Sequence, residues 1–307
     1  MAELSIQEIG MSKRITDYQG LRESIPDIVS EKISSPDSWL DTGCGMGGSV
    51  RASFERFPGT RFVLADPSSE NIAEARKNIQ GAEFVIAPTD GLTMPDASFD
   101  VITAILSHHY YSQREKKMDA VRNCRRMLRE GGMFITVEHT RYDGDQSAKD
   151  SEWRDYMESK GLEERFIAEM FQRRGTVYFP MTEEEHLSML EEAGFRDAKV
   201  FWRTCSDIGI YAFRRCHGKS IPALSTVGKH QITISGSATH DLLLLRNRQL
   251  QACRGDHSSR REGFRRIHRG IGSRGPEGRE RVRTGFPRLL LGPPDHSGEV
   301  PQAGPHG

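Results

Sequence analysis

The sequence predicts an α/β fold built around a mostly parallel β-sheet, and three observations lead to this prediction. Short apolar segments alternate with amphipathic helical segments from residue 38 to residue 193, a pattern typical of strands joined by crossover helices. The first apolar segment runs directly into a glycine-rich turn at residues 43–48. The last two strand-like segments are joined by a turn too short for a parallel crossover, so one of them must run antiparallel.

The strands are predicted from runs of apolar and β-branched residues that are bounded by turn-forming residues. They cover residues 38–42, 62–66, 83–87, 99–106, 133–137, 198–203 and 208–213. The segment at residues 99–106 has the strongest strand character, because it is almost wholly apolar. Seven strands separated by helices are therefore expected.

The helices are predicted from apolar residues at helical spacing and from capping signals. They cover residues 21–33 with an entry near Pro26, 47–57, 69–79, a helix from about residue 112 to Gly131, and 183–193. Ser112 and Glu115 have the spacing of a capping box, as do Thr182 and Glu185. Gly194 stands where a helix commonly ends.

Composition divides the chain into three parts. Residues 1–35 are expected to form an N-terminal helical or lid segment, and residues 36–216 the α/β domain. Within this domain, residues 143–180 form a polar helical insertion that would cover a substrate. Residues 217–307 are rich in arginine and glycine and poor in aromatic residues, so we expect this tail to be disordered.

The formal net charge of zero hides an acidic body and a basic tail. Of 43 basic and 43 acidic residues, the tail at residues 217–307 holds 15 basic and 7 acidic ones. The acidic body argues against nucleic-acid binding by the folded domain, because phosphate contacts need clustered Lys and Arg. The tail is interpreted either as an arm that binds RNA or as an unselected extension.

Cysteine usage and the N-terminus predict a cytoplasmic protein. The five cysteines are odd in number and contain no Cys-x-x-Cys pair, which favours a reducing compartment and gives no metal site. The first 20 residues lack the basic and apolar regions of a signal peptide. No apolar run approaches membrane-spanning length, so no membrane partner is expected.

The glycine-rich turn fits two nucleotide-binding patterns. From Asp41 it has the form Asp-x-Gly-x-Gly-x-Gly, typical of a loop that binds S-adenosylmethionine (SAM). From Gly43 it has the form Gly-x-Gly-x-x-Gly, a dinucleotide fingerprint. In both, glycines allow a positive φ and a close approach to the ligand, and the next helix offers free N–H groups. The turn alone leaves SAM and NAD open.

Three acidic residues at strand ends bear on this choice. Asp66 ends the second strand, where a carboxylate can accept the ribose hydroxyls of either cofactor. Asp41 favours SAM, because a carboxylate before the first glycine suits an ammonium group and would repel a pyrophosphate. Asp90 follows the third strand, where it can accept an adenine amino group or form an ordinary Asp-Gly turn. With the antiparallel final pair, these acids favour SAM.

Residues 16–213 resemble the class I SAM-dependent methyltransferases. The motifs are Leu-Asp-Thr-Gly-Cys-Gly-Met-Gly-Gly from Leu40, Leu-Ala-Asp-Pro-Ser from Leu64, Phe-Asp-Val-Ile-Thr from Phe99 and Met-Leu-Arg-Glu-Gly-Gly from Met127. The resemblance implies a Rossmann-like sheet of seven strands, the last antiparallel, with helices on both faces and SAM across the strand ends. By position, the cofactor site would comprise Asp41, Gly43, Gly45 and Gly47 for the methionine part, Asp66 for the ribose, Asp90 and Gly91 for the adenine, and also Ser107 and Tyr18.

Methyl transfer needs alignment of the reactants and a base where the acceptor must lose a proton. His108 and His109 follow the fourth strand, where methyltransferases acting on amino groups of bases carry an Asn- or Asp-Pro-Pro-aromatic motif. We interpret them as candidate catalytic residues for a small-molecule acceptor with an O, N or S nucleophile, and the alternative is that one packs and the other caps a helix. His139 is a weaker candidate.

Two alternatives stay open. The segment at residues 180–212 also resembles the carboxy-SAM synthases of tRNA modification. That family uses an arginine in this helix for the added carboxylate, whereas Met189 stands at the corresponding place, which favours plain SAM. The second alternative is a regulatory protein that binds SAM without turnover. The oligomeric state is not predicted.

Overall fold

The computed structural model describes residues 6–215 of the 307-residue chain, so the tail predicted at residues 217–307 lies outside the described residues. The strands are β1 (Ser38–Thr42), β2 (Arg61–Asp66), β3 (Glu83–Ile86), β4 (Phe99–Ile105), β5 (Leu128–His139), β6 (Phe195–Arg203) and β7 (Asp207–Arg214). The α-helices are α1 (Ile6–Arg14), α2 (Tyr18–Lys32), α3 (Arg51–Arg56), α4 (Ser69–Asn78), α5 (Arg114–Met127), α6 (Gln146–Ser159), α7 (Glu164–Gln172) and α8 (Glu183–Glu192). Two short 3-10 helices are η1 (Thr89–Gly91) and η2 (His108–Tyr110).

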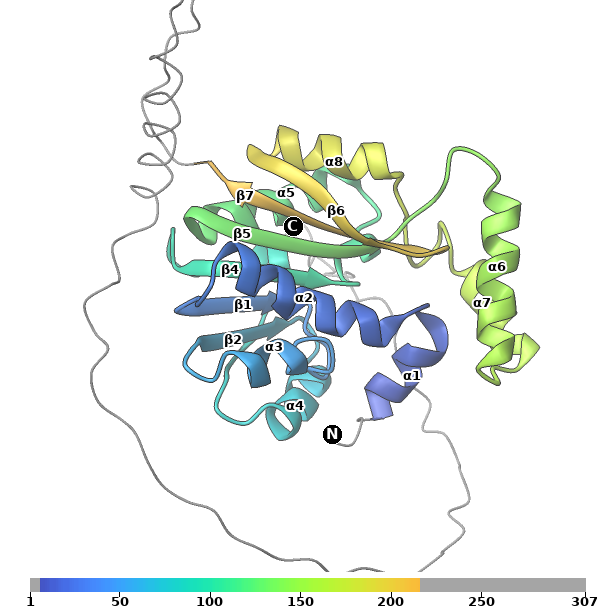
Figure 1. Cartoon of the computed structure of the whole chain (residues 1–307), viewed down its shortest axis with the longest axis horizontal. Helices are drawn as coiled ribbons and strands as arrows, with labels where there is room; N and C mark the ends of the chain where they lie inside the picture. The colour runs from blue at the N-terminus through green and yellow to red at the C-terminus, as the bar shows by residue number, and fades with distance from the viewer. Residues whose placement is uncertain (1–5, 216–307) are drawn as a thin grey trace, which may run out of the picture. The chain divides into compact units, whose positions relative to one another are not determined.

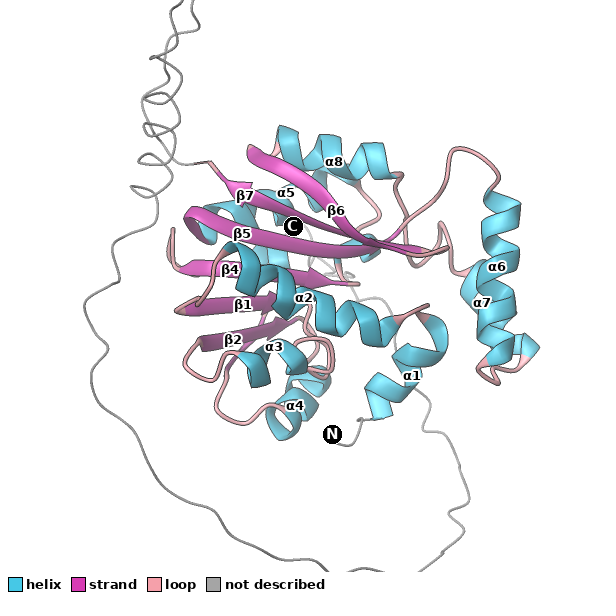
Figure 2. Ribbon diagram, viewed as in Figure 1, coloured by secondary structure: helices cyan, strands magenta, loops and turns pink. Residues whose placement is uncertain are grey.

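The strands form one sheet in the order β3-β2-β1-β4-β5-β7-β6 (Figure 2). Strands β1 to β5 are parallel to their neighbours, whereas β7 runs antiparallel to both β5 and β6. The predicted Rossmann-like sheet with its antiparallel last strand is therefore confirmed. The strand order reverses between β1 and β4, and ligands of such sheets bind at the carboxyl ends of the strands next to this reversal.

Helices cover both faces of the sheet (Figure 1). On one face, Leu21 and Ile25 of α2 and Ile72 of α4 belong to a buried apolar layer. On the other face, Met118 of α5 and Leu190 of α8 belong to the second layer. The two layers bury the strands on both sides, which is why the central strands are apolar along their whole length.

The insertion after β5 folds into α6 and α7 and has its own small core. This core includes Trp153, Met157 and Ile167. The insertion also contacts α1, since Trp153 Nε1 donates to the carbonyl oxygen of Arg14 at 2.7 Å and Tyr156 Oη donates to that of Ser12 at 2.6 Å. The N-terminal helix and the insertion thus meet near the carboxyl ends of β4 and β5 (Figure 1).

Several predicted details are confirmed and others are wrong. The capping box of Thr182 with Glu185 is present, and Gly194 has the positive φ of 88° expected after a helix. The first helix of the sheet domain begins at Tyr18 with Asp17 as its cap, so Pro26 lies inside it rather than at its entry. The predicted cap at Ser112 is wrong, as described next.

Helix α5 begins after Gln113, which is extended and makes no side-chain cap. Tyr111 Oη donates to Asp90 Oδ1 at 2.9 Å, and this contact ties the segment after η2 to η1. Gln113 occupies the N-cap position, and Ser112 lies one residue before it, so Ser112 cannot cap the helix. The helix also ends earlier than predicted, at Met127, because β5 begins at Leu128 with a backbone pairing to Phe99.

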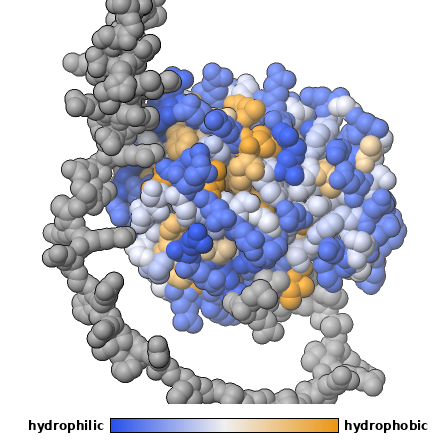
Figure 3. Space-filling view, viewed as in Figure 1, coloured by the Kyte–Doolittle hydropathy of each residue, from blue (hydrophilic) through white to orange (hydrophobic). Residues whose placement is uncertain are grey.

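The face of the described part in view is mainly hydrophilic, with a few apolar patches. Figure 3 shows apolar side chains gathered over β5, β7 and β6, whereas the insertion is largely hydrophilic. Within residues 6–215, none of the helices combines the length and the apolar character needed to cross a membrane.

Candidate functional site

The glycine turn after β1 is shaped by close packing against its neighbours. Gly43, Gly45 and Gly47 all have positive φ, at 69°, 53° and 84°. A Cβ atom on Gly43 would lie 2.3 Å from Cβ of Ser107, which is impossible without a backbone shift. The end of β4 thus approaches the turn so closely that only glycine fits.

Asp41 lies directly before this turn and is 1 % exposed. Its Oδ1 accepts a hydrogen bond of 2.6 Å from Thr103 Oγ1, whereas Oδ2 is buried without a hydrogen-bond partner. Burial raises the pKa of this carboxyl to about 7, the hydrogen bond from Thr103 opposes the rise, and the nearby Asp66 adds to it. A buried carboxylate with a free oxygen is suited to receive a cationic group such as the ammonium of a methionine moiety.

Asp66, at the end of β2, is held against the same turn. Its Oδ2 accepts from the backbone N–H of Gly45 at 2.9 Å. Its Oδ1 accepts from the N–H of Ser68 and from Nδ2 of Asn71, both at 3.0 Å. These contacts place the carboxylate between the glycine turn and the start of α4, at the position where the sequence predicts a ribose contact.

The N-terminal helices close over the turn through polar contacts. Tyr18 Oη lies 3.2 Å from Oγ of Ser49, so the predicted lid tyrosine reaches the end of the glycine turn. Glu8 of α1 is fully buried, with Arg22 Nη2 at 2.6 Å and Arg51 Nη1 at 3.1 Å. These contacts join α1 and α2 to α3, the helix that follows the turn.

Asp90 and Gly91 lie in η1, after β3. Besides the hydrogen bond from Tyr111, Asp90 has Lys116 Nζ at 3.9 Å from its Oδ2. The neighbouring Thr89 lies 2.7 Å, Oγ1 to Oγ1, from Thr42 at the end of β1. The sheet therefore brings Asp41, Asp66 and Asp90 to one edge, because the three strands before them are parallel neighbours.

Ser107 and the two histidines after β4 differ in their surroundings. Ser107 Oγ donates to the carbonyl oxygen of Thr42 at 3.2 Å, which ties it to the glycine turn. His108 is buried, with Nε2 3.3 Å from Thr89 Oγ1, and burial together with the nearby Lys117 lowers its pKa to about 3. A histidine with so low a pKa is neutral in the folded protein and has little access to an acceptor.

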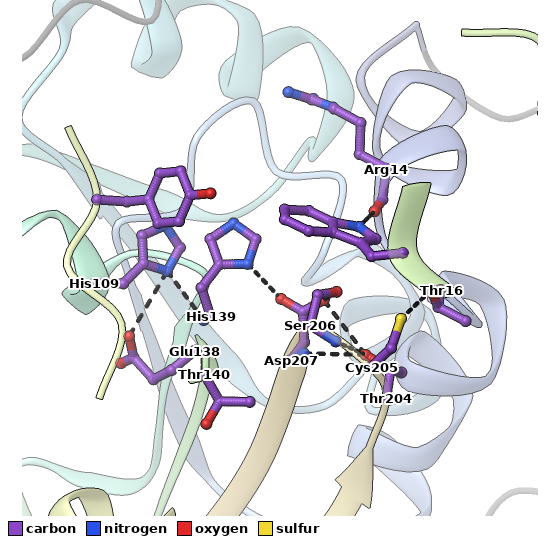
Figure 4. Close-up of polar contacts among 12 residues, drawn as sticks. Arg14, Thr16, His109, Glu138, His139, Thr140, Thr204, Cys205, Ser206 and Asp207 are labelled. Atoms are coloured by element: carbon purple, nitrogen blue, oxygen red, sulfur yellow. Dashed lines mark hydrogen bonds and ion pairs between the residues drawn. The ribbon is translucent and has the colours of Figure 1, made fainter. Parts of the chain in front are cut away.

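His109 belongs instead to a buried polar cluster at the ends of β4, β5 and β7, which we call the acceptor-side cluster. It consists of His109, Glu138, His139 and Asp207 (Figure 4). The sequence prediction omitted Glu138 and Asp207. Asp207 could have been found only from the register of β5 with β7, which pairs it with His139 across the sheet.

Two hollows lie near these residues. A cavity of about 10 Å³ is lined by His108, Lys117, Glu138 and His186 among others, and it has room for a single water molecule at most. An open cleft of about 990 Å³ runs along α8 and β6 and includes Thr140 in its lining. None of the glycine-turn residues lines this cleft, so it is separate from the predicted cofactor site. Across residues 6–215, no cluster of three or more His, Cys, Asp or Glu is arranged to hold a metal ion.

Comparison with known proteins identifies a methyltransferase domain. The family model described as "Methyltransferase domain" matches residues 40–136, about a third of the chain, from β1 into β5. Isonocardicin synthase of Nocardia uniformis is 28% identical over 122 residues, which cover 39% of each chain. Malonyl-[acyl-carrier protein] O-methyltransferase of Enterobacter lignolyticus is 33% identical over 95 residues, 31% of this chain and 36% of the relative.

A third relative is matched over a longer stretch. Carboxy-S-adenosyl-L-methionine synthase of Shewanella amazonensis is 23% identical over 203 residues, 63% of this chain and 82% of the relative. The chain thus spans less than half the length of the first two relatives and most of the third. The matched family, these relatives and the sheet with its antiparallel β7 agree: the chain contains a methyltransferase domain of the class I SAM-dependent type, with similarity to carboxy-SAM synthases.

Proposed function

We propose that this protein transfers a methyl group from SAM to a small-molecule acceptor. The proposal rests on the contact between α1 and α6 at the carboxyl ends of β4 and β5. We call this pair of helices the roof. Hydrogen bonds from Trp153 to Arg14 and from Tyr156 to Ser12 tie the two helices together. An acceptor that reaches the strand ends beneath this roof must be small, or the roof must open.

The residues at the glycine turn fit SAM. The unpartnered Oδ2 of Asp41 offers a place for an ammonium group, and Gly43, Gly45 and Gly47 leave the backbone free of side chains. Asp66 would accept the ribose hydroxyls by exchanging some of its present donors. When bound, SAM supplies an electrophilic methyl group that leaves a neutral thioether behind.

The test begins with binding. Isothermal titration is expected to give SAM binding and no NAD binding, and Asp41→Ala should weaken SAM binding strongly. Release of S-adenosylhomocysteine in the presence of a metabolite panel then separates a methyltransferase from a protein that only binds SAM. Preferential binding of NAD, or unchanged SAM affinity in Asp41→Ala, would overturn the assignment of the turn.

A carboxy-SAM synthase activity is the second candidate, because relatives with that name match most of their length. Met189, which stands where that family uses an arginine, is 2 % exposed and belongs to an apolar layer, so it offers no charge to a carboxylate. We therefore favour methyl transfer. Mass spectrometry of the cofactor recovered after turnover distinguishes the two activities, because only the synthase adds a carboxyl group to it.

We further propose that residues 36–216 form the catalytic domain, that residues 143–180 cover the acceptor, and that residues 1–35 act as a lid. A cytoplasmic location accords with the three free cysteines, Cys44, Cys124 and Cys205, among the described residues. Fractionation of cells that express the full chain tests the location.

A further inference from the structure

The pair of His139 and Asp207 in the acceptor-side cluster has the arrangement of a histidine oriented by a carboxylate. His139 Nδ1 lies 2.7 Å from Asp207 Oδ1, close enough for the carboxylate to keep a proton on Nδ1, although the angle of the contact is not that of a linear hydrogen bond. Asp207 is fully buried and is held by the hydroxyl of Ser206 on its other oxygen. The carboxylate thus leaves Nε2 of His139 as the nitrogen that can accept a proton.

The neighbouring His109 is fixed in a different state. The backbone N–H of His139 points to His109 Nδ1 at 3.4 Å, and Glu138 Oε2 lies 3.7 Å from the same nitrogen. With Nδ1 accepting from the backbone, we assign the proton of the neutral ring to Nε2. Burial and the neighbouring His139 hold the pKa of His109 well below its ordinary value. Its Nε2 is buried without a partner, which makes it an unused hydrogen-bond donor beside His139.

Aromatic rings enclose this pair of histidines. The ring of His139 lies 4.5 Å from that of His109, 4.8 Å from that of Tyr178 and 5.7 Å from that of Trp153, centroid to centroid. Trp153 is the residue that ties the insertion to α1, so His139 lies directly beside the roof (Figure 4). These rings pack directly against His139 and hold its orientation.

His139 and His108 differ in the features that a base requires. His139 retains 7 % exposure and a carboxylate partner, whereas His108 is 1 % exposed and contacts the hydroxyl of Thr89. Asp207 places a carboxylate beside the ring of His139. His108 has the positive Lys117 nearby instead, which disfavours its protonation.

From this geometry we propose that His139 is the general base of the reaction and that the acceptor is a compound with an acidic hydroxyl, such as a phenol or an enol. The inference rests on the proposed methyl transfer and narrows its acceptor. Asp207 is a positioning residue that orients His139, and His109 Nε2–H donates to an oxygen of the acceptor. An amine or thiol acceptor would leave this donor without an oxygen to bind.

The proton and electron balance is complete with the two substrates alone. The hydroxyl proton moves to Nε2 of His139, the oxygen lone pair forms a bond to the methyl carbon, and the carbon–sulfur bond breaks with its electrons on sulfur. The products are a methyl ether, S-adenosylhomocysteine and a protonated His139, which then releases its proton to solvent. No oxidant, reductant or metal takes part.

The test uses 4-nitrophenol as the probe, because its neutral and ionised forms absorb at different wavelengths. The full chain is loaded with S-adenosylhomocysteine, and the probe is added one pH unit below its own pKa. The wild-type protein is expected to bind it as the phenolate. His139→Gln should bind it as the neutral phenol, and Asp207→Asn should bind a mixture. Lys77→Gln, at an exposed position on α4, is the control and should keep the phenolate signal.

Folding of each variant is checked by its affinity for S-adenosylhomocysteine, which should stay within about twofold of wild type. With SAM and unsubstituted phenol, whose hydroxyl stays neutral near pH 7, His139→Gln should lower kcat/KM about 10²- to 10⁴-fold. Failure of the wild-type protein to bind the probe as phenolate, or a phenolate signal that persists in His139→Gln, would overturn the inference. Methylation of aniline or thiophenol but not of phenols would overturn it while leaving methyl transfer intact, and loss of SAM binding by the wild type would instead overturn the proposed function.

Discussion

The two halves of the sheet's carboxyl edge differ in how their charged groups are partnered. On the side of β1 and β2, Asp66 receives three hydrogen bonds from residues within the turn and the start of α4. On the side of β4, β5 and β7, four histidines, a lysine and two acids are buried together, and several of their nitrogen and oxygen atoms have no partner. The first half leaves one buried carboxylate oxygen, Oδ2 of Asp41, without a partner, whereas the second leaves unpartnered atoms on several side chains.

This difference shows what each half depends on. The glycine turn of the cofactor half is made by consecutive residues, so the geometry of the turn itself is local. The acceptor half is assembled by the sheet from β4, β5, β7, α5 and α8, so each of its contacts joins residues far apart in the sequence. Substitutions in the acceptor half should therefore disturb the fold more, and those in the cofactor half should disturb binding more.

The largest effect is expected for Lys117→Met. Lys117 Nζ lies 3.5 Å from Glu138 Oε2, and both side chains are buried. Removing the lysine leaves an uncompensated buried carboxylate, whose pKa burial already raises, so the free energy of unfolding should fall by about 3–5 kcal/mol. Urea denaturation measures the change.

The double variant Lys117→Met with Glu138→Gln should recover most of that loss, because no buried charge remains. Lys116→Met is the matched control, since Lys116 is the preceding residue and 59 % of its side chain is exposed. If Lys117→Met lowered the free energy of unfolding by less than about 1 kcal/mol, the buried pair of Lys117 and Glu138 would not be important for the stability of the acceptor half.

Asp41→Ala should have the next largest effect, and on binding rather than folding. Removing the carboxylate deprives the cofactor ammonium of its partner, which should cost about 2–4 kcal/mol, or roughly 30- to 1000-fold in SAM affinity. Titration calorimetry measures it. Asp37→Ala, an exposed acid beside the same strand, should leave the affinity unchanged. If the two variants bound SAM equally well, Asp41 would have no role in the site.

The same contrast explains how much of the molecule the sequence could predict. Strand β1 was predicted at its observed bounds, and the glycine turn was located, because both depend on residues within one short stretch. The capping box at Thr182 was also predicted, whereas the one at Ser112 was wrong. The difference is that a tertiary contact, from Tyr111 to Asp90, holds the residues before α5 in an extended conformation.

The contacts of the acceptor half could not be predicted from local sequence patterns. His108 and His109 are adjacent in sequence and looked equivalent, yet one contacts Thr89 and the other lies beside His139. Only the antiparallel register of β7 brings Asp207 to His139. Burial of Lys117 on a helix with many charged residues gave no signal in the sequence either, because its partner Glu138 lies on a strand 21 residues away.

Gly43→Ala tests the steric fit of the glycine turn rather than its charge. Its positive φ and the 2.3 Å approach of an added Cβ to Ser107 should destabilise the fold by about 2 kcal/mol and weaken SAM binding. Adding Ser107→Gly should relieve the clash and restore part of the stability, which thermal denaturation can follow. Gly59→Ala is the control, because nothing lies within 4 Å of an added Cβ there. Equal stability of the Gly43 and Gly59 variants would contradict this account of the turn.

The smallest expected effect, taken per pH unit, is the pH dependence of SAM binding, and it isolates a single group in the cofactor half. The pKa of Asp41 is raised from 3.8 to about 7, so its ionised form, which the cofactor ammonium needs, becomes populated as the pH rises toward 7. SAM affinity should therefore increase from pH 5 to pH 7, by at most about tenfold per unit, or about 1.4 kcal/mol. Burial raises the pKa of both Tyr18 and Cys44, so these neighbours stay neutral over this range.

The stability of the unliganded protein should change in the opposite direction. Because folding raises the pKa of this acid, the folded state favours the protonated form, and the free energy of unfolding should fall as the pH rises from about 4 to about 7. Asp41→Asn removes the titrating group, so both trends should flatten in calorimetric and urea measurements made across this range. A pH dependence of SAM binding that survives in Asp41→Asn would assign it to another group and would weaken the case for Asp41 as the partner of the ammonium.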